Sequence, residues 1–199
     1  MAGYPEDNLA SRVAHPAALN NGLILSIIIG YDATTLREQA DPQAALARLD
    51  ELGELRSLSA LEEKITLLRL IDRLDEAALI ANEAVRLSRF TGDRKQLASS
   101  RIRRAQVQQY QGKLDEAQAE LSHCVQEAEA HEWLDVAASA RENRGKVHFD
   151  QGSYEAAAAD FTAAVFLRER AGASPQEIEN SLLAVAVIEK FIAADDASR

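Results

Sequence analysis

The chain has little of the residues that build disulfide frameworks or β-sheets. It contains one cysteine, Cys124, in 199 residues, and aromatic residues make up 5% of it. A single cysteine cannot close a disulfide within the chain, which is usual for proteins of a reducing cytoplasm. β-Sheet proteins favour aromatic and β-branched residues, whereas alanine and leucine, the strongest helix formers, dominate the apolar residues of this chain. Composition therefore predicts a helical protein.

Positive charge is also in short supply. There are 22 lysines and arginines against 32 aspartates and glutamates, which gives a formal net charge of −10. Such a chain repels the phosphate backbone of nucleic acids and the anionic surface of membranes, so we expect neither as a partner. A basic peptide or protein surface is an easier partner, although the charge also favours solubility.

Long apolar runs are absent as well. The most apolar stretch, residues 22–30, is far below the roughly 20 residues that cross a bilayer. We expect it to form a buried helix turn at the end of a helix over residues 16–29. Glu6 and Asp7 stand near the N-terminus, and no basic segment precedes an apolar run as in a secretory signal. These features predict a cytoplasmic protein.

The sequence repeats itself at an interval of 40 residues. Leu74-Asp75-Glu76-Ala77 recurs as Leu114-Asp115-Glu116-Ala117, and a second shift reaches Tyr154-Glu155-Ala156-Ala157. So many matches in one register without gaps indicate a repeated structural unit. The same shift also aligns Val85 with Val125 and Val165, Ser99 with Ser139, Arg101 with Arg141, and Arg104 with Arg144.

Each unit has the pattern of two helices. Gly112 and Gly152 break the helical run, and an acidic residue follows near the start of the next helix, where the helix dipole favours negative charge. Cys124 falls at a small position of the second helix, so we expect it to be a core residue rather than a redox or catalytic one. The small residues expected where the two helices touch are Ala77, Ala117 and Ala157.

The third unit resembles a known family. Gly145-x-x-His148-x-x-x-Gly152-x-Tyr154-x-x-Ala157-x-x-x-Phe161-x-x-Ala164 is similar to the tetratricopeptide repeat (TPR) signature. The 40-residue period resembles the longer variant of this repeat found in kinesin light chains and several bacterial regulators. The resemblance implies an all-α fold, a right-handed α-solenoid of helix-turn-helix repeats that ends in a C-terminal capping helix.

The resemblance covers about residues 55–194 and divides the chain into units. Residues 1–54 are expected to form N-terminal helices, the second of which begins near Pro42. One interpretation is that these helices are a degenerate first repeat. The units that follow are three repeats at about residues 55–93, 94–133 and 134–173, a C-terminal helix over 175–194 and a tail over 195–199.

Four arginines depart from the family pattern. They stand in the first helices, where the family buries large apolar residues. Either their stems lie along the helix hairpin with the charged ends in water, or these helices are rotated. The four residues are Arg101, Arg104, Arg141 and Arg144.

No motif for catalysis or for a cofactor is recognisable. The sequence lacks a glycine-rich phosphate loop, a nucleophile elbow and paired cysteines. His123, Glu127 and His131 fall four residues apart on one predicted helix, a spacing that suits a divalent metal but is more typical of a solvated face. We therefore expect no catalytic residue, no cofactor and no bound metal.

The family resemblance implies that the protein binds another protein. In the family, the first helix of each repeat faces a concave groove in which a partner segment lies. The expected function is a non-enzymatic scaffold for a protein or peptide partner. The groove residues that the family pattern assigns to partner binding are Arg103, Gln106, Gln109, Tyr110, Glu142, Asn143, Lys146 and Phe149.

The C-terminal helix leads to an alternative function. Ser174 suits its cap, Pro175 its first position and Glu177 its first turn. The helix is apolar on two sides, so it either contacts the rest of the fold or joins two copies in a homodimer. A third hypothesis is the sensing module of a bacterial regulator. The residues proposed for self-association are Leu183, Val187 and Phe191.

Overall fold

A computed structural model describes residues 26–32 and 34–197 of the chain. This part is mostly helical, consistent with the predicted all-α fold class, and it also contains one antiparallel pair of strands that the sequence did not predict. The strands are β1 (Ile28–Asp32) and β2 (Arg37–Ala40). The helices are α2 (Pro42–Leu52), α3 (Leu58–Leu70), α4 (Leu74–Thr91), α5 (Arg94–Tyr110), α6 (Leu114–Ala130), α7 (Leu134–Asp150), α8 (Tyr154–Ala171) and α9 (Pro175–Asp196).

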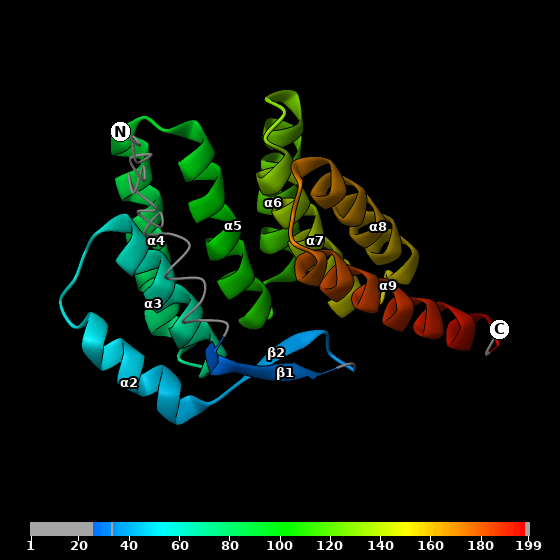
Figure 1. Cartoon of the computed structure of the whole chain (residues 1–199), viewed down its shortest axis with the longest axis horizontal. Coiled ribbons are helices and arrows are strands. Elements are labelled where there is room, and N and C mark those ends of the chain that lie inside the picture. Colours follow the sequence, from blue (N-terminus) through cyan, green and yellow to red (C-terminus); the bar gives the residue numbers. More distant parts are fainter. Residues whose placement is uncertain (1–25, 33, 198–199) are drawn as a thin grey trace, which may run out of the picture.

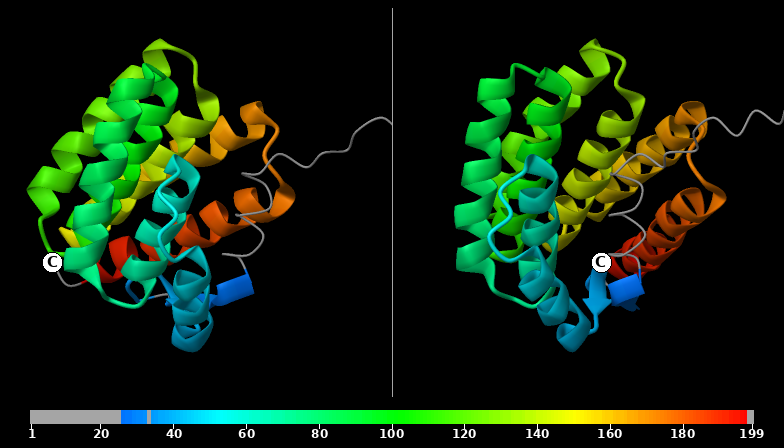
Figure 2. Two further views of the ribbon diagram at one scale, coloured as in Figure 1. Left: turned by 90° about the vertical axis from the view of Figure 1, so that its left-hand side faces the viewer. Right: turned by 60° about the vertical axis from the view of Figure 1, so that its left-hand side comes forward.

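The helices form a row in which each one packs against the next along the chain (Figure 1). The connections are short, so consecutive helices run in opposite directions. α3 also contacts α5, and α5 contacts α7, so these three helices share one side of the row. We call this side the inner face. Figure 2 shows from two further directions that α9 ends the row and that the β1–β2 hairpin lies between α2 and α9.

The turns between helices keep the 40-residue register even where glycine is missing. Gly112 and Gly152 adopt left-handed backbone angles, with φ of 75° and 73°. Asp72, which is 40 residues before Gly112, takes the same conformation with φ of 60°. A glycine is free of the steric cost of this region, whereas aspartate tolerates it through its short polar side chain. The packing of the helices therefore requires this turn conformation even where the residue is not glycine.

The predicted small residues lie at the contacts between the paired helices. Ala77, Ala117 and Ala157 are all completely buried, as is Cys124. Because a methyl group is the whole side chain at these positions, the two helix backbones can approach closely. The prediction that these alanines and the cysteine are core residues is confirmed.

A leucine at either of two buried alanines should therefore destabilise the protein. Ala117→Leu or Ala157→Leu adds a branched side chain to a filled contact and should lower the free energy of unfolding by about 1–3 kcal/mol. Urea unfolding followed by circular dichroism measures this. Ala119→Leu and Ala159→Leu are matched controls, because both alanines are exposed on the same two helices. Equal losses in the controls and the test variants would contradict the assignment.

The C-terminal helix begins as the sequence predicts. The backbone N–H of Glu177 donates to Ser174 Oγ over 3.3 Å, and the Ser174 backbone N–H donates to Glu177 Oε2 over 3.0 Å. Pro175 is the first helical residue. The helix continues to Asp196, so Asp195 and Asp196, which were assigned to a tail, belong to α9.

The N-terminal region differs from its prediction. The expected helix over residues 16–29 falls largely outside the described residues, but its end forms strand β1, in which Tyr31 pairs with Glu38. Isoleucines favour strands because they are β-branched, and Ile29 is exposed, so the buried helix turn expected there is wrong. The helix near Pro42 is confirmed, and Asp41 Oδ1 caps it by accepting from the Gln43 N–H over 2.9 Å.

The four departing arginines form two equivalent ion-pair clusters. Arg101 Nε and Arg104 Nε lie 3.1 and 2.9 Å from the two carboxylate oxygens of Glu120. Forty residues further on, Arg141 Nη1 and Arg144 Nε lie 3.0 and 2.7 Å from the oxygens of Asp160. Neither predicted arrangement is found, because each pair of arginines turns to a buried carboxylate on the partner helix. The sequence pattern missed Glu120 and Asp160, whose acidic character repeats after 40 residues.

Candidate binding surface

The structure brings together all eight residues that the family pattern assigned to partner binding. Four lie on α5 and four on α7, on the inner face. None of them is freely exposed, and Gln109, Asn143 and Phe149 are buried. Contacts within the chain therefore engage this surface.

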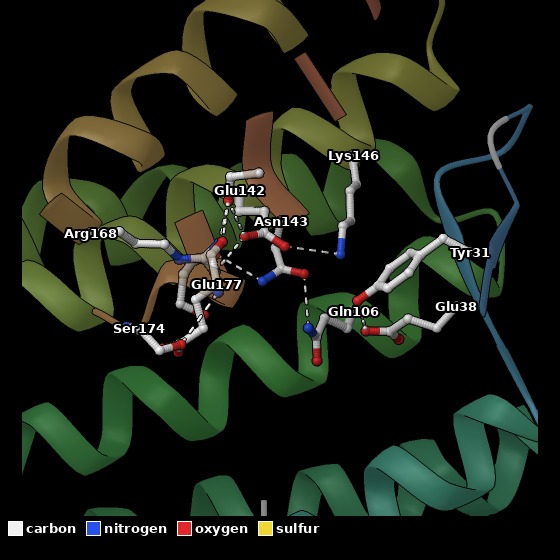
Figure 3. A network of polar contacts seen from close by, with 11 residues as sticks. Tyr31, Glu38, Gln106, Glu142, Asn143, Lys146, Arg168, Ser174 and Glu177 are labelled. Atoms are coloured by element: carbon white, nitrogen blue, oxygen red, sulfur yellow. Dashed lines mark hydrogen bonds and ion pairs between the residues drawn. The ribbon is translucent and has the colours of Figure 1, made fainter. Parts of the chain in front are cut away.

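Polar side chains link the helices of the inner face to one another. Gln106 Nε2 donates to Asn143 Oδ1 over 2.8 Å, which joins α5 to α7 (Figure 3). Asn143 Nδ2 in turn donates to the Ser139 carbonyl over 2.8 Å. Arg103 Nη1 donates to Thr66 Oγ1 over 3.2 Å and so joins α5 to α3. These bonds fix the spacing of the helices and engage both the oxygen and the nitrogen of the Asn143 amide.

A buried carboxylate lies between two cations on α7 and α8. Glu142 Oε1 is 3.2 Å from Lys146 Nζ, and Glu142 Oε2 is 2.5 Å from Arg168 Nη2 (Figure 3). Burial by itself raises the pKa of Glu142, but Lys146 and Arg168 outweigh burial and lower it. Burial likewise lowers the pKa of Lys146, while Glu142 and Glu38 raise it by more. Both groups therefore stay charged at neutral pH.

The β1–β2 hairpin covers one end of the inner face. Leu36 is 7% exposed and packs in one apolar cluster with Phe149, Phe161 and Ile188. Leu36 has φ of 54°, a left-handed conformation that costs a non-glycine residue about 1–2 kcal/mol. Burial of its side chain against α7, α8 and α9 offsets this cost.

Two charged residues of β2 pair with the helices beneath. Arg37 Nη2 lies 3.2 Å from Asp150 Oδ2, and Glu38 Oε2 lies 2.7 Å from Arg69 Nη2. Both guanidinium groups lie over the ring of Tyr110, at 4.6 and 4.8 Å from its centroid, where the π-electrons favour a cation. Tyr110, predicted to contact a partner, therefore contacts the hairpin.

Because Glu38 must be ionised to pair with Arg69, the stability of the hairpin contact depends on pH. Burial raises the pKa of Glu38, but Arg69 and Lys146 outweigh burial and hold it at about 2. The folded-state pKa is thus below that of the unfolded chain. The stabilisation from Glu38 is present above the unfolded pKa and is lost as the pH falls towards 2.

The residues predicted for self-association differ in exposure, although Leu183 and Val187 line the same cleft. Leu183 is 59% exposed, whereas Phe191 packs edge-on against Phe149 with ring centroids 4.9 Å apart. Val187 lines a cleft beside the hairpin. Two of the three residues therefore serve the fold, and Leu183 faces solvent beside Leu182, which is also exposed.

Two clefts open on the inner face. The first measures about 250 Å³ and is mostly apolar. The second measures about 310 Å³, lies between α5 and α7, and is lined by both polar and apolar side chains. Lining residues of the first are Tyr31, Leu36, Lys146, Phe161, Leu183 and Val187, and of the second Ser99, Ile102, Arg103, Gln106, Val136 and Ser139.

The other residues weighed for chemistry have ordinary structural roles. Burial raises the pKa of the Cys124 thiol to about 12, which disfavours the reactive thiolate. His131 stacks on Trp133 with ring centroids 4.7 Å apart, and Glu127 accepts from Arg94 over 2.8 Å. Among the described residues, no three His, Cys, Asp or Glu side chains come together as a metal site. No described helix has the length and hydropathy to span a membrane.

Sequence reasoning missed the hairpin half of this surface. Leu36, Arg37 and Glu38 lie outside the 40-residue register, and so does the pairing that brings them to Arg69 and Asp150. The β-branched isoleucines at the start of β1 were the available signal, since such residues favour strands.

The fold and this surface define a mostly helical protein with a polar inner face and a hairpin docked on it. No family model and no curated protein matches the sequence. Among solved structures, the crystal structure of BtubC (BKLC) from P. vanneervenii is similar, with a TM-score of 0.58 at 15% sequence identity. The similarity covers 76% of this chain and 65% of the BtubC chain. At this identity it supports a shared helical fold alone.

Proposed function

We propose that the protein is a non-enzymatic scaffold that binds a protein or peptide partner. In this proposal the helix pairs α3–α4, α5–α6 and α7–α8 are TPR-like repeats of a right-handed α-solenoid, and α9 is its cap. The inner face is then the concave groove in which the partner lies.

The observation that carries the proposal is the hairpin itself. Leu36, which directly precedes strand β2, enters an apolar cluster on the helices, and Arg37 and Glu38 of the extended strand form ion pairs with them. The inner face thus has the spacing and chemistry to hold an extended polypeptide, which is one of the recurring modes of peptide recognition.

The remaining open part of this face also favours a polar partner segment. Arg103 and Gln106 line the second cleft and are half-buried. Arg103 Nε is shielded from solvent and makes no hydrogen bond in the described chain, where its ion-pair partner, Glu62 Oε2, lies 3.8 Å away. A carbonyl or carboxylate oxygen of a partner would satisfy this donor, and a buried unsatisfied donor costs free energy until it is satisfied.

Removing these two groups should weaken partner binding. We expect Arg103→Ala with Gln106→Ala to lower partner recovery by about tenfold or more, because loss of a charge-assisted hydrogen bond costs roughly 1.5–3 kcal/mol. Affinity capture from the source organism with quantitative mass spectrometry measures this. The control is Leu79→Ser with Phe90→Ser, two exposed residues of α4, outside the inner face. A partner lost with the control variant but kept with the groove variant would refute the proposal.

Self-association through α9 is a second candidate function. Leu182 and Leu183 are adjacent and exposed on the terminal helix, which leaves an apolar patch at the end of the row. Light scattering of the full chain decides this question, because a homodimer has twice the mass of the monomer.

A further inference from the structure

The hairpin is attached to the inner face by few contacts. Within the described chain, its two strands pair with each other in a sheet of two, and an isolated pair of this kind is marginally stable in water. Its base is anchored, because Ile27 is buried in a cluster with residues of α2 and α3. Its far end is held by Leu36 and by the ion pairs of Arg37 and Glu38. The helices pack on one another without it, so this end can leave while the row stays folded.

The fit between the hairpin and the helices is incomplete at three points. Leu36 reaches its site through an unfavourable left-handed conformation. The apolar cleft of about 250 Å³ opens directly beside its side chain. Arg37 Nε and Arg69 Nε are shielded from solvent at this contact and meet no acceptor among residues 26–32 and 34–197. Apolar space and the Nε donor of Arg69 are therefore left for a different segment, since Arg37 belongs to the hairpin and would leave with it.

We propose that the hairpin is a displaceable internal occupant, and that the face beneath it binds an extended partner peptide of defined chemistry. The peptide carries an apolar residue bulkier than leucine, followed by a basic and then an acidic residue. The inference rests on the proposed function, because it names the kind of segment that the inner face takes.

The apolar position follows from the cleft. Leu36 lines one side of it, while Phe161 and Val187 line others. A phenylalanine or methionine side chain in place of Leu36 would extend into this space and bury more apolar surface, which strengthens binding.

The order of charges follows from the groups that the hairpin would leave behind. With the hairpin in place, Asp150 is 15% exposed and Arg69 is 5% exposed, and each has a partner ion on the hairpin. Because both ion pairs break when the hairpin leaves, a competing segment that brings a cation to Asp150 and an anion to Arg69 restores them. Lys146, which also lowers the pKa of Glu38, adds to the attraction for the anion.

Three labelled peptides and two forms of the full chain test the proposal. The parent peptide is residues 32–41, DATTLREQAD; a second carries Leu36→Phe, and a third exchanges the charges by Arg37→Glu with Glu38→Arg. Fluorescence anisotropy measures binding to the wild-type chain and to a chain carrying Leu36→Asp, which releases the hairpin. We expect the released chain to bind the parent peptide about tenfold more tightly than the wild-type chain does. This factor corresponds to a site that the hairpin covers about nine-tenths of the time in the wild-type chain. The Leu36→Phe peptide should bind more tightly than the parent, and the exchanged peptide should not bind.

A second released chain keeps the test valid if Leu36→Asp disturbs folding. Arg37→Ala with Glu38→Ala removes both ion pairs, leaves Leu36 in place, and should give a smaller gain in peptide affinity. Adding Asp150→Ala to either released chain should abolish that gain. Circular dichroism confirms that the helices are retained.

Three results would overturn the inference. In the first, the released chains stay helical but do not bind the parent peptide. In the second, the wild-type chain binds this peptide as tightly as the released chains do. In the third, the released chains form dimers by light scattering, which would show that the hairpin of a second copy takes the site. If Arg103→Ala with Gln106→Ala still prevents partner capture in these cases, the proposed function stands and only the assignment of this peptide fails.

Discussion

Replacing Asp160 by alanine should lower the free energy of unfolding by about 2–4 kcal/mol. Asp160 is 3% exposed and holds Arg141 and Arg144 through three hydrogen bonds. Without the carboxylate, Arg144 would lose its ion-pair partner, whereas Arg141 would keep Glu129, whose Oε1 accepts from Arg141 Nε over 2.6 Å. The loss is at the lower end of that for fully buried pairs, because both arginines keep some contact with solvent.

In the α3–α4 pair, the site equivalent to this ion cluster contains no carboxylate. The residues 40 positions before Arg101, Arg104 and Glu120 are Leu61, Lys64 and Ile80. Leu61 and Ile80 belong to one apolar cluster, and Lys64 Nζ turns away to the carbonyls at the end of α2. We therefore expect the triple change Arg141→Leu, Arg144→Lys and Asp160→Ile to stay within about 1 kcal/mol of the wild type, since apolar replacement of a whole ion cluster is often neutral.

Urea unfolding of the full chain measures both effects. Glu169→Ala is the control, because Glu169 is an exposed acidic residue of the same helix and its removal should change stability by less than about 0.5 kcal/mol. If the triple variant is as unstable as Asp160→Ala alone, the unpaired Arg144 is not the cause of the loss.

The second large effect concerns the ring of Phe161, which is the largest fully buried side chain described. Phe161→Ala should cost about 3–5 kcal/mol, the usual loss for a core phenylalanine. Its ring lies against Gly145, where an added Cβ would stand 2.7 Å from Phe161 Cδ2. Gly145→Ala should therefore cost about 1–3 kcal/mol, although alanine is the better helix former.

Combining the two changes distinguishes this contact from general damage to the core. The methyl group of Gly145→Ala would occupy part of the space left by Phe161→Ala, so the double variant should lose less than the sum of the single losses. A double-mutant cycle from urea unfolding gives this coupling energy directly. The control is Phe166→Ala on the same helix, because Phe166 is 58% exposed and should contribute little. Strictly additive losses would show that the ring and the glycine do not interact.

Features encoded within a few residues or by the repeat could be predicted from the sequence. Ala117 and Ala157 identified the helix contacts, and Ser174 with Glu177 identified the start of α9. The eight residues that the family pattern assigned to partner binding lie on α5 and α7, because a helical period fixes which side chains share a face. Their exposure could not be predicted, since it depends on a segment about 70 to 110 residues earlier in the chain.

The sequence by itself determined the helices, their ends and the small residues at which they meet. These features depend on local preferences and on a repeat that can be aligned without knowing the fold. The tertiary structure alone decided that Arg144 turns to Asp160 and that Leu36, Arg37 and Glu38 lie on the inner face. The physical reason is that a charge or an apolar side chain accepts many partners of suitable chemistry, and only the packed chain brings one of them within contact distance.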